Sequence, residues 1–210
     1  MTNHVNPHPS RTAIYIDGFN LYFGLKSKGW QKYYWLDLWE FSTRLADKRK
    51  LVSVKYFTSD ISGPQDKVSR QQAFLNAIRV HSPSVQIIKG KYLTKAVQCR
   101  KCSTVYDTQQ EKMTDVNIAS HVINDAWKDI FDVAIIISGD SDLVPPIHMV
   151  NREFPSKKVV VGFPPKRTSK EIVSTTQYFY VNESCFKHSQ MTDTIIKPDG
   201  TFITKPPSWI

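Results

Sequence analysis

Short apolar runs alternate along the chain with longer segments in which apolar residues recur every three or four positions. Runs rich in β-branched and aromatic residues are typical of strands, whereas the longer period is typical of a helix with one buried face. We therefore expect strands at residues 12–17, 51–59, 85–93, 133–138, 157–163 and 177–181. We expect helices between them at residues 19–29, 36–48, 66–81, 114–130, 143–154 and 169–176.

Residues at the helix ends support these assignments. Gly29 is expected to stop the first helix, Asp37 to cap the second and Thr114 to cap the fourth, because short oxygen-bearing side chains accept hydrogen bonds from the first free backbone amides. The two prolines of the helix at 143–154 fit only its first turn. The apolar positions at helical spacing in the fourth helix are Val116, Ala119, Ile123 and Trp127.

The regular alternation of strands and helices predicts an α/β fold with a mostly parallel sheet and helices on both faces, because this order is typical of such sheets. The 210 residues suffice for one sizeable domain. We expect a disordered N-terminus over residues 1–10, an excursion at 94–113 and a loosely held C-terminal extension over 184–210.

Four carboxylates fall where this fold gathers functional groups. Asp17 ends the first strand, Asp140 and Asp142 follow the fourth, and Asp115 lies in the first turn of the helix that leads into the fourth. In an open parallel sheet these points meet beyond the carboxyl ends of the strands, where the strand order reverses. Each aspartate alone could instead be a helix cap.

Clustered carboxylates repel one another unless a proton or a cation neutralises them. An oxygen-only donor set suits a hard cation such as Mg²⁺ or Mn²⁺, and such ions support displacement at phosphorus. The sequence therefore predicts a metal site at this edge of the sheet.

Net charge and cysteine content indicate which kind of partner and which cellular compartment to expect. The chain has 28 Lys and Arg against 19 Asp and Glu, a formal charge of +9, which favours a polyanionic partner. No stretch has the ~20 apolar residues of a membrane span, and the N-terminus has no apolar signal region. Three cysteines make a disulfide framework improbable, so we expect a cytoplasmic protein.

Cys99 and Cys102 have the spacing of half a zinc-ribbon site. A closed site needs four ligands, so Cys185, His121, His148 or the second subunit of a homodimer would have to complete it. Because only half of such a ligand set is visible in the sequence, the default interpretation is a pair of reduced thiols on an exposed hairpin.

Three motifs resemble the NYN domain of the PIN-like nuclease superfamily, in the bacterial branch grouped as LabA-like. They are IDGFNLY (16–22), EKMTDVNIA (111–119) and IISGDSDLVPPI (136–147), in the order of the family, and the resemblance covers residues 11–183. It implies a Rossmann-like PIN sheet and metal-dependent cleavage of phosphodiesters, mostly in RNA, although not every member has demonstrated activity.

The resemblance also assigns roles to individual residues. It implies that Asp17, Asp115, Asp140 and Asp142 hold the metal. Asn20 would orient a ligand, Lys112 would neutralise a phosphate, and Ser138 and Ser141 would donate hydrogen bonds. The competing interpretations are that Asn20 only stabilises a turn and that Lys112 is a solvated surface charge.

Other residues are candidates for contact with the substrate. Lys166, Arg167 and Lys170 follow the fifth strand and can meet the phosphate backbone. Aromatic residues after the first motif either stack on unpaired bases or pack in the core. They are Tyr22, Phe23, Trp30, Tyr33, Tyr34 and Trp35.

We expect a Mg²⁺- or Mn²⁺-dependent ribonuclease acting on single-stranded or structured RNA. The alternatives are an RNA-binding regulatory module with a non-catalytic pocket, and a hydrolase of DNA or small phosphates. A haloacid-dehalogenase arrangement is disfavoured, because Phe19 stands where its second aspartate would be.

Overall fold

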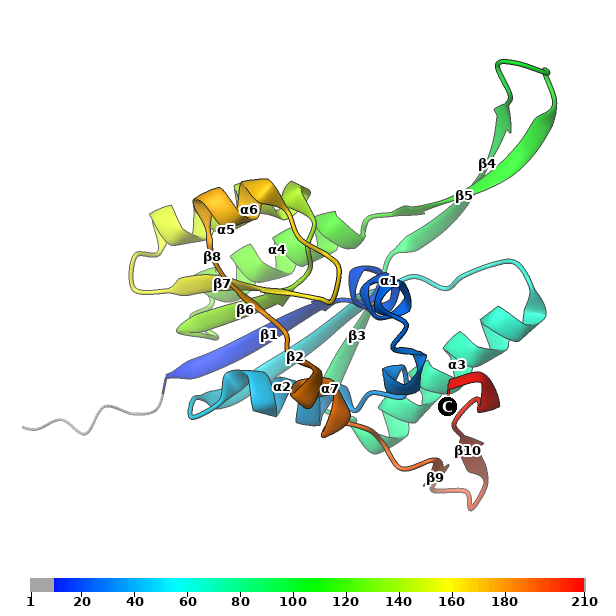
Figure 1. The fold of residues 1–210 in the computed structure, drawn as a ribbon. Helices are drawn as coiled ribbons and strands as arrows, with labels where there is room; N and C mark the ends of the chain where they lie inside the picture. The colour runs from blue at the N-terminus through cyan, green and yellow to red at the C-terminus, as the bar shows by residue number, and fades with distance from the viewer. Residues whose placement is uncertain (1–9, 210) are drawn as a thin grey trace, which may run out of the picture.

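The protein is built around a six-stranded parallel sheet (Figure 1). The computed structural model describes residues 10–209, with only the backbone described at 92–95 and 106–111. The strand order is β3-β2-β1-β6-β7-β8. The strands are β1 (Arg11–Asp17), β2 (Lys50–Thr58), β3 (Val85–Lys89), β6 (Val133–Ile137), β7 (Lys158–Phe163) and β8 (Gln177–Tyr180). The α/β fold predicted from the sequence is confirmed.

Seven helices within the described residues accompany the sheet, along with three short 3-10 helices. The α-helices are α1 (Gly18–Lys28), α2 (Leu38–Ala46), α3 (Gln65–His81), α4 (Thr114–Trp127), α5 (Val144–Glu153), α6 (Lys170–Thr175) and α7 (Glu183–Lys187). The 3-10 helices are η1 (Gln31–Tyr33), η2 (Ser141–Leu143) and η3 (Pro207–Trp209). Asp37 caps α2 as expected, accepting hydrogen bonds from the amides of Trp39 and Glu40.

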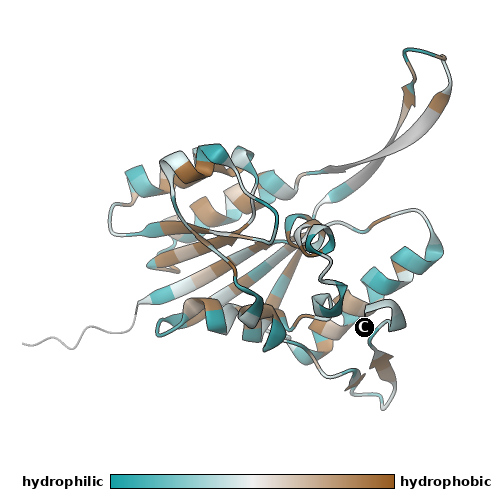
Figure 2. Cartoon of the chain, viewed as in Figure 1, coloured by the Kyte–Doolittle hydropathy of each residue, from teal (hydrophilic) through white to brown (hydrophobic). Residues whose placement is uncertain are grey.

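Two apolar cores lie on opposite faces of the sheet, since alternate strand residues point to opposite sides. In β1, Ile14 and Ile16 face the core formed with α1, α2, α3 and α7, whereas Ala13 and Tyr15 face the core formed with α4, α5 and α6. Hydrophobic positions run along the central strands and recur on the helices that pack against them (Figure 2). Helices therefore cover both faces, as the alternation of elements predicts.

Strands β1 and β6 are neighbours in the sheet although more than 100 residues separate them. Ile16 pairs with Ile137, so both strands leave the sheet at the same level. The chain moves from β1 to β2 and β3 on one side, and from β6 to β7 and β8 on the other. The strand order thus reverses between β1 and β6, as predicted for the position of the acidic residues.

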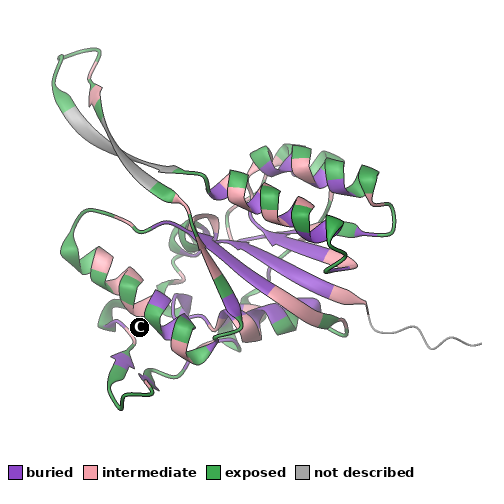
Figure 3. Ribbon diagram, turned by 180° about the vertical axis from the view of Figure 1, so that it is seen from behind, coloured by how far each residue is buried: buried purple, intermediate pink, exposed green. Residues whose placement is uncertain are grey.

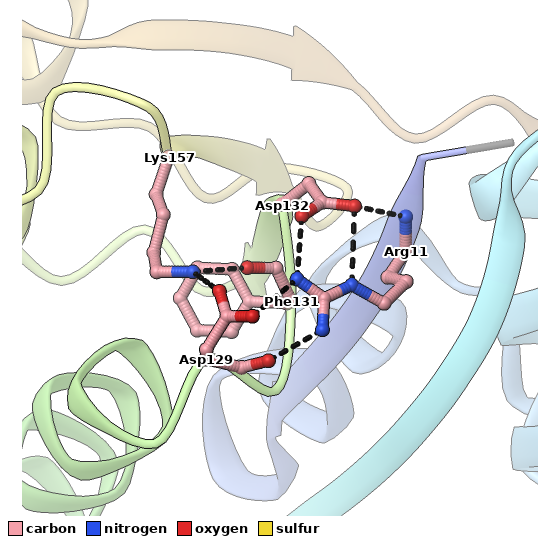
Figure 4. A network of polar contacts seen from close by, with 5 residues as sticks. All are labelled: Arg11, Asp129, Phe131, Asp132 and Lys157. Carbon is pink, nitrogen blue, oxygen red and sulfur yellow. Dashed lines mark hydrogen bonds and ion pairs between the residues drawn. The ribbon is translucent and has the colours of Figure 1, made fainter. Parts of the chain in front are cut away.

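An ion-pair network ties these two strands together at the opposite edge of the sheet (Figure 4). The Arg11 guanidinium donates to Asp132, with 2.7 Å from Nη2 to Oδ1, and to Asp129, with 3.0 Å from Nη2 to Oδ2. Lys157 donates to the carbonyl oxygen of Phe131 at 2.8 Å. The network joins the start of β1 to the turn between α4 and β6, far along the strands from the acidic residues.

A long antiparallel hairpin stands away from the body of the molecule (Figure 1). It consists of β4 (Lys91–Gln98) and β5 (Val105–Lys112), paired from Lys91 with Lys112 to Gln98 with Val105. The single strand expected at 85–93 is therefore wrong. The chain leaves the sheet at Lys89, and the excursion begins before residue 94 because β4 starts at Lys91.

The buried face of α4 differs from the expectation. Val116 and Trp127 are 66% and 79% exposed, whereas Ile118, Val122 and Ala126 are buried. Both sets have helical spacing, and the orientation of the helix against the sheet selects between them. Thr114 is not the cap: it is the first helical residue, follows Met113 in the left-handed conformation, and its buried hydroxyl has no hydrogen-bond partner among the described residues.

The C-terminal segment is not loosely held. It forms α7, the hairpin of β9 (Thr194–Ile196) and β10 (Phe202–Thr204), and η3. Met191, Ile195 and Trp209 are buried in the core shared with α1, α2 and α3. A few apolar residues, spaced through a mostly polar sequence, hold this segment on the core. The polar composition of the segment therefore does not predict its packing.

Burial is concentrated in the sheet, while most of the described side chains in the hairpin of β4 and β5 are exposed (Figure 3). The disorder expected over residues 1–10 falls almost wholly outside the described residues. Ser10 is described, and its carbonyl oxygen accepts a hydrogen bond from the amide of Lys50. Among the described helices, none has the length and apolar character needed to cross a membrane.

Candidate functional site

Asp17 lies at the point where β1 passes into α1, and it is 4% exposed. Its Oδ1 atom accepts a hydrogen bond from the amide of Asn20 at 3.0 Å, which caps α1. Its Oδ2 atom accepts a hydrogen bond from the Ser138 hydroxyl at 2.9 Å. The side chain is therefore held in one orientation from two separate segments.

The pKa of Asp17 is raised to about 6. Burial is the main cause, since it disfavours the charged form, and the nearby charges of Asp115 and Asp140 raise the pKa further. The hydrogen bonds from Asn20 and Ser138 oppose these effects. Asp17 is thus a buried acid whose charge is opposed by other acids.

A hydrogen-bond network joins the loop after β6 to the start of α1. The Ser138 hydroxyl accepts a hydrogen bond from the amide of Asp140 at 3.1 Å while donating to Asp17. The amide of Gly139 donates to the side-chain oxygen of Asn20 at 3.0 Å. Asn20 and Ser138 therefore link the first and third sequence motifs, in addition to any role toward a ligand.

Asp140 and Asp142 follow this loop. Asp140 precedes η2, and its Oδ1 atom accepts a hydrogen bond from the amide of Asp142 at 3.0 Å. Asp140 and Ser141 are half-buried and Asp142 is exposed. Asp17 and Asp140 are therefore both helix caps, as the competing interpretation held, and both still belong to the acidic cluster.

Asp115 enters the same cluster from α4. It is half-buried, and its pKa is raised, first by burial and then by the charges of Asp140 and Asp142. We call Asp17, Asp115, Asp140 and Asp142 the carboxylate cluster. Their mutual effect on pKa shows that the fold gathers all three segments at one edge of the sheet.

The donor set suits a hard cation, because it consists of carboxylate oxygens that repel one another. Among the described residues, however, no three His, Cys, Asp or Glu side chains are arranged as a ready-made metal site. The side chains therefore interact through their charges without already forming a coordination shell.

The predicted basic residues differ in their contacts and exposure. Arg167 packs against Gly139, where an added Cβ would lie 3.0 Å from the Arg167 backbone carbon, and its guanidinium lies over the Phe23 ring. Within the described chain, its buried Nε atom has no hydrogen-bond partner. Lys166 is exposed, and Lys112 is exposed at the base of the hairpin. Arg167 is thus the basic residue placed directly beside the acidic loop.

Cys99 and Cys102 lie at the tip of the hairpin of β4 and β5. Ser103 follows them in the left-handed conformation, and the hydrogen bond with Thr104 lowers the pKa of the Cys102 thiol. The three expected partners lie elsewhere: Cys185 is in α7, His121 contacts Lys55, and His148 faces Thr175. None of them completes a group of three ligands within the described residues.

Most aromatic residues after the first motif pack in the core, with Trp35 fully buried. Tyr22 and Phe23 are about two-fifths exposed on α1. Beside Asp17, aromatic side chains line a cavity of about 440 Å³ between α1, α3 and the C-terminal η3. We call it the aromatic pocket, and its aromatic residues include Tyr22, Tyr34, Tyr56, Phe74 and Trp209. Sequence reasoning missed Tyr56, Phe74 and Trp209 as site residues, because they come from distant segments and have no shared motif.

A buried polar network also escaped sequence reasoning. Lys55 of β2 forms an ion pair with Asp125 of α4, and Tyr15 donates a hydrogen bond to the same carboxylate at 2.7 Å. Burial, reinforced by Asp125, raises the pKa of Tyr15, and burial next to Lys55 lowers the pKa of His121. The network lies beneath α4 and supports the helix that carries Asp115.

Comparison with known proteins gives three findings. The family model described as NYN domain matches residues 11–184. 6-Hydroxy-3-succinoylpyridine 3-monooxygenase HspA of Pseudomonas putida is 28% identical over 184 residues, and the match covers 71% of this chain and 58% of that protein. The chain thus spans little more than half the length of this curated relative.

The third finding concerns the fold. A crystal structure of VPA0982, a protein of unknown function from Vibrio parahaemolyticus, matches with a TM-score of 0.57 and 22% identity. The match covers 85% of this chain and 96% of that one. At this identity the likeness supports the fold alone.

Proposed function

The chain belongs to the NYN domain family, and from that premise we propose that it is a metal-dependent ribonuclease. The observation that carries the proposal is the carboxylate cluster. Asp17, Asp115 and Asp140 come from three separate segments, and the pKa of Asp17 is raised first by burial and further by the charges of Asp115 and Asp140. Such a cluster favours a bound cation because the cation removes the repulsion.

The residues of the cluster would hold Mg²⁺ or Mn²⁺, which supplies an activated water and shields charge on the phosphate. Ser138 and the Asn20 amide hold the Asp17 carboxylate in place. Arg167, beside Gly139, would meet a phosphate of the substrate, together with the exposed Lys166 and Lys112. Ser141 would donate a hydrogen bond to the same phosphate.

The net charge of +9 supports a polyanionic substrate. An RNA chain would meet the basic residues through its backbone, largely without regard to sequence. We propose a cytoplasmic setting on the basis of the cysteine content.

The test is cleavage of labelled RNA in Mn²⁺ or Mg²⁺ by the wild type and by Asp140→Asn. We expect loss of at least 100-fold in rate for Asp140→Asn, because a cation ligand is removed. Asp193→Asn is the matched control, since its side chain is 81% exposed and lies in the C-terminal segment. Metal-dependent cleavage that survives Asp140→Asn would contradict the proposal.

Two alternatives are separated by the same assay. Salt-sensitive RNA binding without product in any divalent ion would indicate a regulatory RNA-binding module. Preference for single-stranded DNA or a phosphomonoester over single-stranded RNA would indicate a hydrolase of other phosphates.

The Pseudomonas relative suggests a second candidate, oxidation of a small heteroaromatic compound. The aromatic pocket beside the carboxylate cluster is the observation that favours it, since its volume suits a small molecule. Consumption of a hydroxylated pyridine in the presence of a reductant and oxygen, unaffected by Asp140→Asn, would support this candidate over the nuclease.

A further inference from the structure

The aromatic pocket adjoins the carboxylate cluster through consecutive residues. Asp17 belongs to the cluster, and Gly18 and Phe19 line the pocket. We infer that the aromatic pocket binds one unstacked base of an RNA strand whose neighbouring phosphate lies at the carboxylate cluster. The identity of this ligand rests on the proposed function.

The walls of the pocket form a connected series of rings. The Tyr22 and Tyr34 ring centroids are 4.8 Å apart, and those of Tyr34 and Trp209 are 5.4 Å apart. Phe74 follows at 6.1 Å from Trp209, and Tyr56 at 6.1 Å from Phe74. Aromatic faces stack on any base, because every base has a π-face.

The size of the pocket suits one base. Its volume of about 440 Å³ lies within the range of roughly 300–1,000 Å³ typical of small-ligand sites. Trp209 closes one side from the C-terminal segment, while Tyr22 remains two-fifths exposed on α1. Tyr22 is therefore the more accessible of these two rings and Trp209 the more enclosed.

The wall of the aromatic pocket lies close to Asp17, because Gly18, the next residue, packs against Tyr56. A Cβ atom on Gly18 would lie 2.6 Å from the Tyr56 hydroxyl, so only glycine lets α1 approach Tyr56 this closely. Burial and the charge of Asp17 raise the pKa of Tyr56. A base in the pocket thus lies next to the residue that would hold the metal.

The charged side chains that line the aromatic pocket are positive, as expected for a site that binds the phosphate backbone of a nucleic acid. Lys26, Lys67 and Arg70 line the pocket, and its described lining includes no acidic side chain. Arg70 also forms an ion pair with Asp66, one turn earlier on α3, at 2.8 Å. A lining that combines cations with aromatic rings matches a phosphate joined to a base.

The loop that borders the pocket is held in shape. The Gln71 side chain accepts a hydrogen bond from the amide of Ile61 at 3.0 Å and donates one to the carbonyl oxygen of Ser59 at 2.9 Å. The segment between β2 and α3 therefore presents a defined wall to a ligand.

The test is binding without turnover. Fluorescence anisotropy in EDTA would compare a labelled ten-nucleotide oligouridylate with the same strand made abasic at every position. We expect Tyr22→Ala and Trp209→Ala to bind the intact strand roughly five- to a hundredfold more weakly than wild type. We expect both variants to bind the abasic strand like wild type.

Tyr180→Ala and Trp127→Ala are the matched controls, because both side chains are exposed and neither lines the pocket. Tyr22→Ala keeps the test decisive if Trp209→Ala does not fold. Equal affinity of Tyr22→Ala and Tyr180→Ala for the intact strand would overturn the inference.

Competition with uridine monophosphate and with nicotinate tests whether the pocket prefers a nucleobase or a small aromatic acid. Displacement of the strand by nicotinate but not by the nucleotide would overturn the inference in favour of a small aromatic acid. Base-dependent binding without cleavage in Mn²⁺ would reject the proposed function and leave the inference standing. Cleavage of RNA together with unchanged binding by Tyr22→Ala would support the proposed function and reject the inference about the pocket.

Discussion

At the residue scale, Asp17 combines three roles that oppose one another energetically. It caps α1, it accepts the Ser138 hydroxyl, and it lies buried beside Asp115 and Asp140. The first two stabilise its charged form and the third destabilises it. A site that binds a cation carries such a cost in the absence of the cation.

We expect Asp17→Asn to raise the free energy of unfolding in EDTA at pH 8 by about 1–3 kcal/mol, because each unit of pKa shift corresponds to about 1.4 kcal/mol. The pKa of Asp17 is about 6 when folded and near 3.8 in its ordinary state. The wild type therefore loses stability as the pH rises from about 4 to 6. The gain in the variant should be complete above pH 6 and absent below pH 4, as measured by urea unfolding. A gain that did not depend on pH would contradict this account.

The buried pair of Lys55 and Asp125 gives a second residue-scale prediction. Lys55→Met leaves Asp125 buried without its cation, and we expect a loss of about 3–5 kcal/mol in the free energy of unfolding. The double variant Lys55→Met, Asp125→Asn should recover much of this loss. Equal stability of the single and double variants would show that the ion pair is not the cause.

At the element scale, the hairpin of β4 and β5 connects β3 to α4, and so precedes the helix that carries Asp115. Only its base is close to the carboxylate cluster, while its tip presents Cys99 and Cys102 away from the body of the molecule (Figure 1). A two-thiol tip is half of a tetrahedral zinc site. The other half would have to come from a second copy, because no third ligand lies nearby among the described residues.

Zinc held between the hairpin tips of a homodimer would give about 0.5 zinc per chain, whereas the default interpretation, reduced thiols, gives none. Elemental analysis and the mass in solution with and without a chelator would measure this. Cys99→Ser should lose both the zinc and the dimer, whereas Cys185→Ser should keep them, because Cys185 lies in α7. A monomer without zinc would leave reduced thiols as the correct interpretation.

At the scale of the whole molecule, the C-terminal segment contributes to both stability and the candidate site. The Trp35 indole donates a hydrogen bond to the carbonyl oxygen of Thr192 at 2.8 Å, and Trp209 lies against Tyr34, Trp35 and Phe74. The segment therefore completes the core and forms one wall of the aromatic pocket.

Neighbouring isoleucines in β9 provide a direct test of this packing. Ile195 is 5% exposed and Ile196 is 66% exposed. We expect Ile195→Ala to lower the free energy of unfolding by about 2–5 kcal/mol and Ile196→Ala to change it by less than about 0.5 kcal/mol. Thermal unfolding of the two variants would measure the difference, and equal values would mean that the segment does not pack on the core.

The sequence by itself determined the alternation of strands and helices that builds the main sheet, and the edge of that sheet at which the acids meet. Apolar runs identify β1 and β6, Asp17 ends the first and Asp140 lies in the loop just after the second, so the rule for parallel sheets is enough to bring them together. Asp37 and Gly29 likewise mark helix ends through local backbone chemistry. Local signals suffice here, because the physical cause lies within a few residues.

Only the tertiary structure decided which of several competing patterns is realised. Both faces of α4 have helical spacing, and packing on the sheet buries Ile118 instead of Val116. The aromatic pocket joins Tyr22, Tyr56 and Trp209, which are far apart in the chain and have no common motif. The pairing of Lys55 with Asp125 also arises only when β2 and α4 come together. Contacts between distant segments depend on how whole helices and strands pack against one another. Sequence patterns within a few residues do not predict this packing.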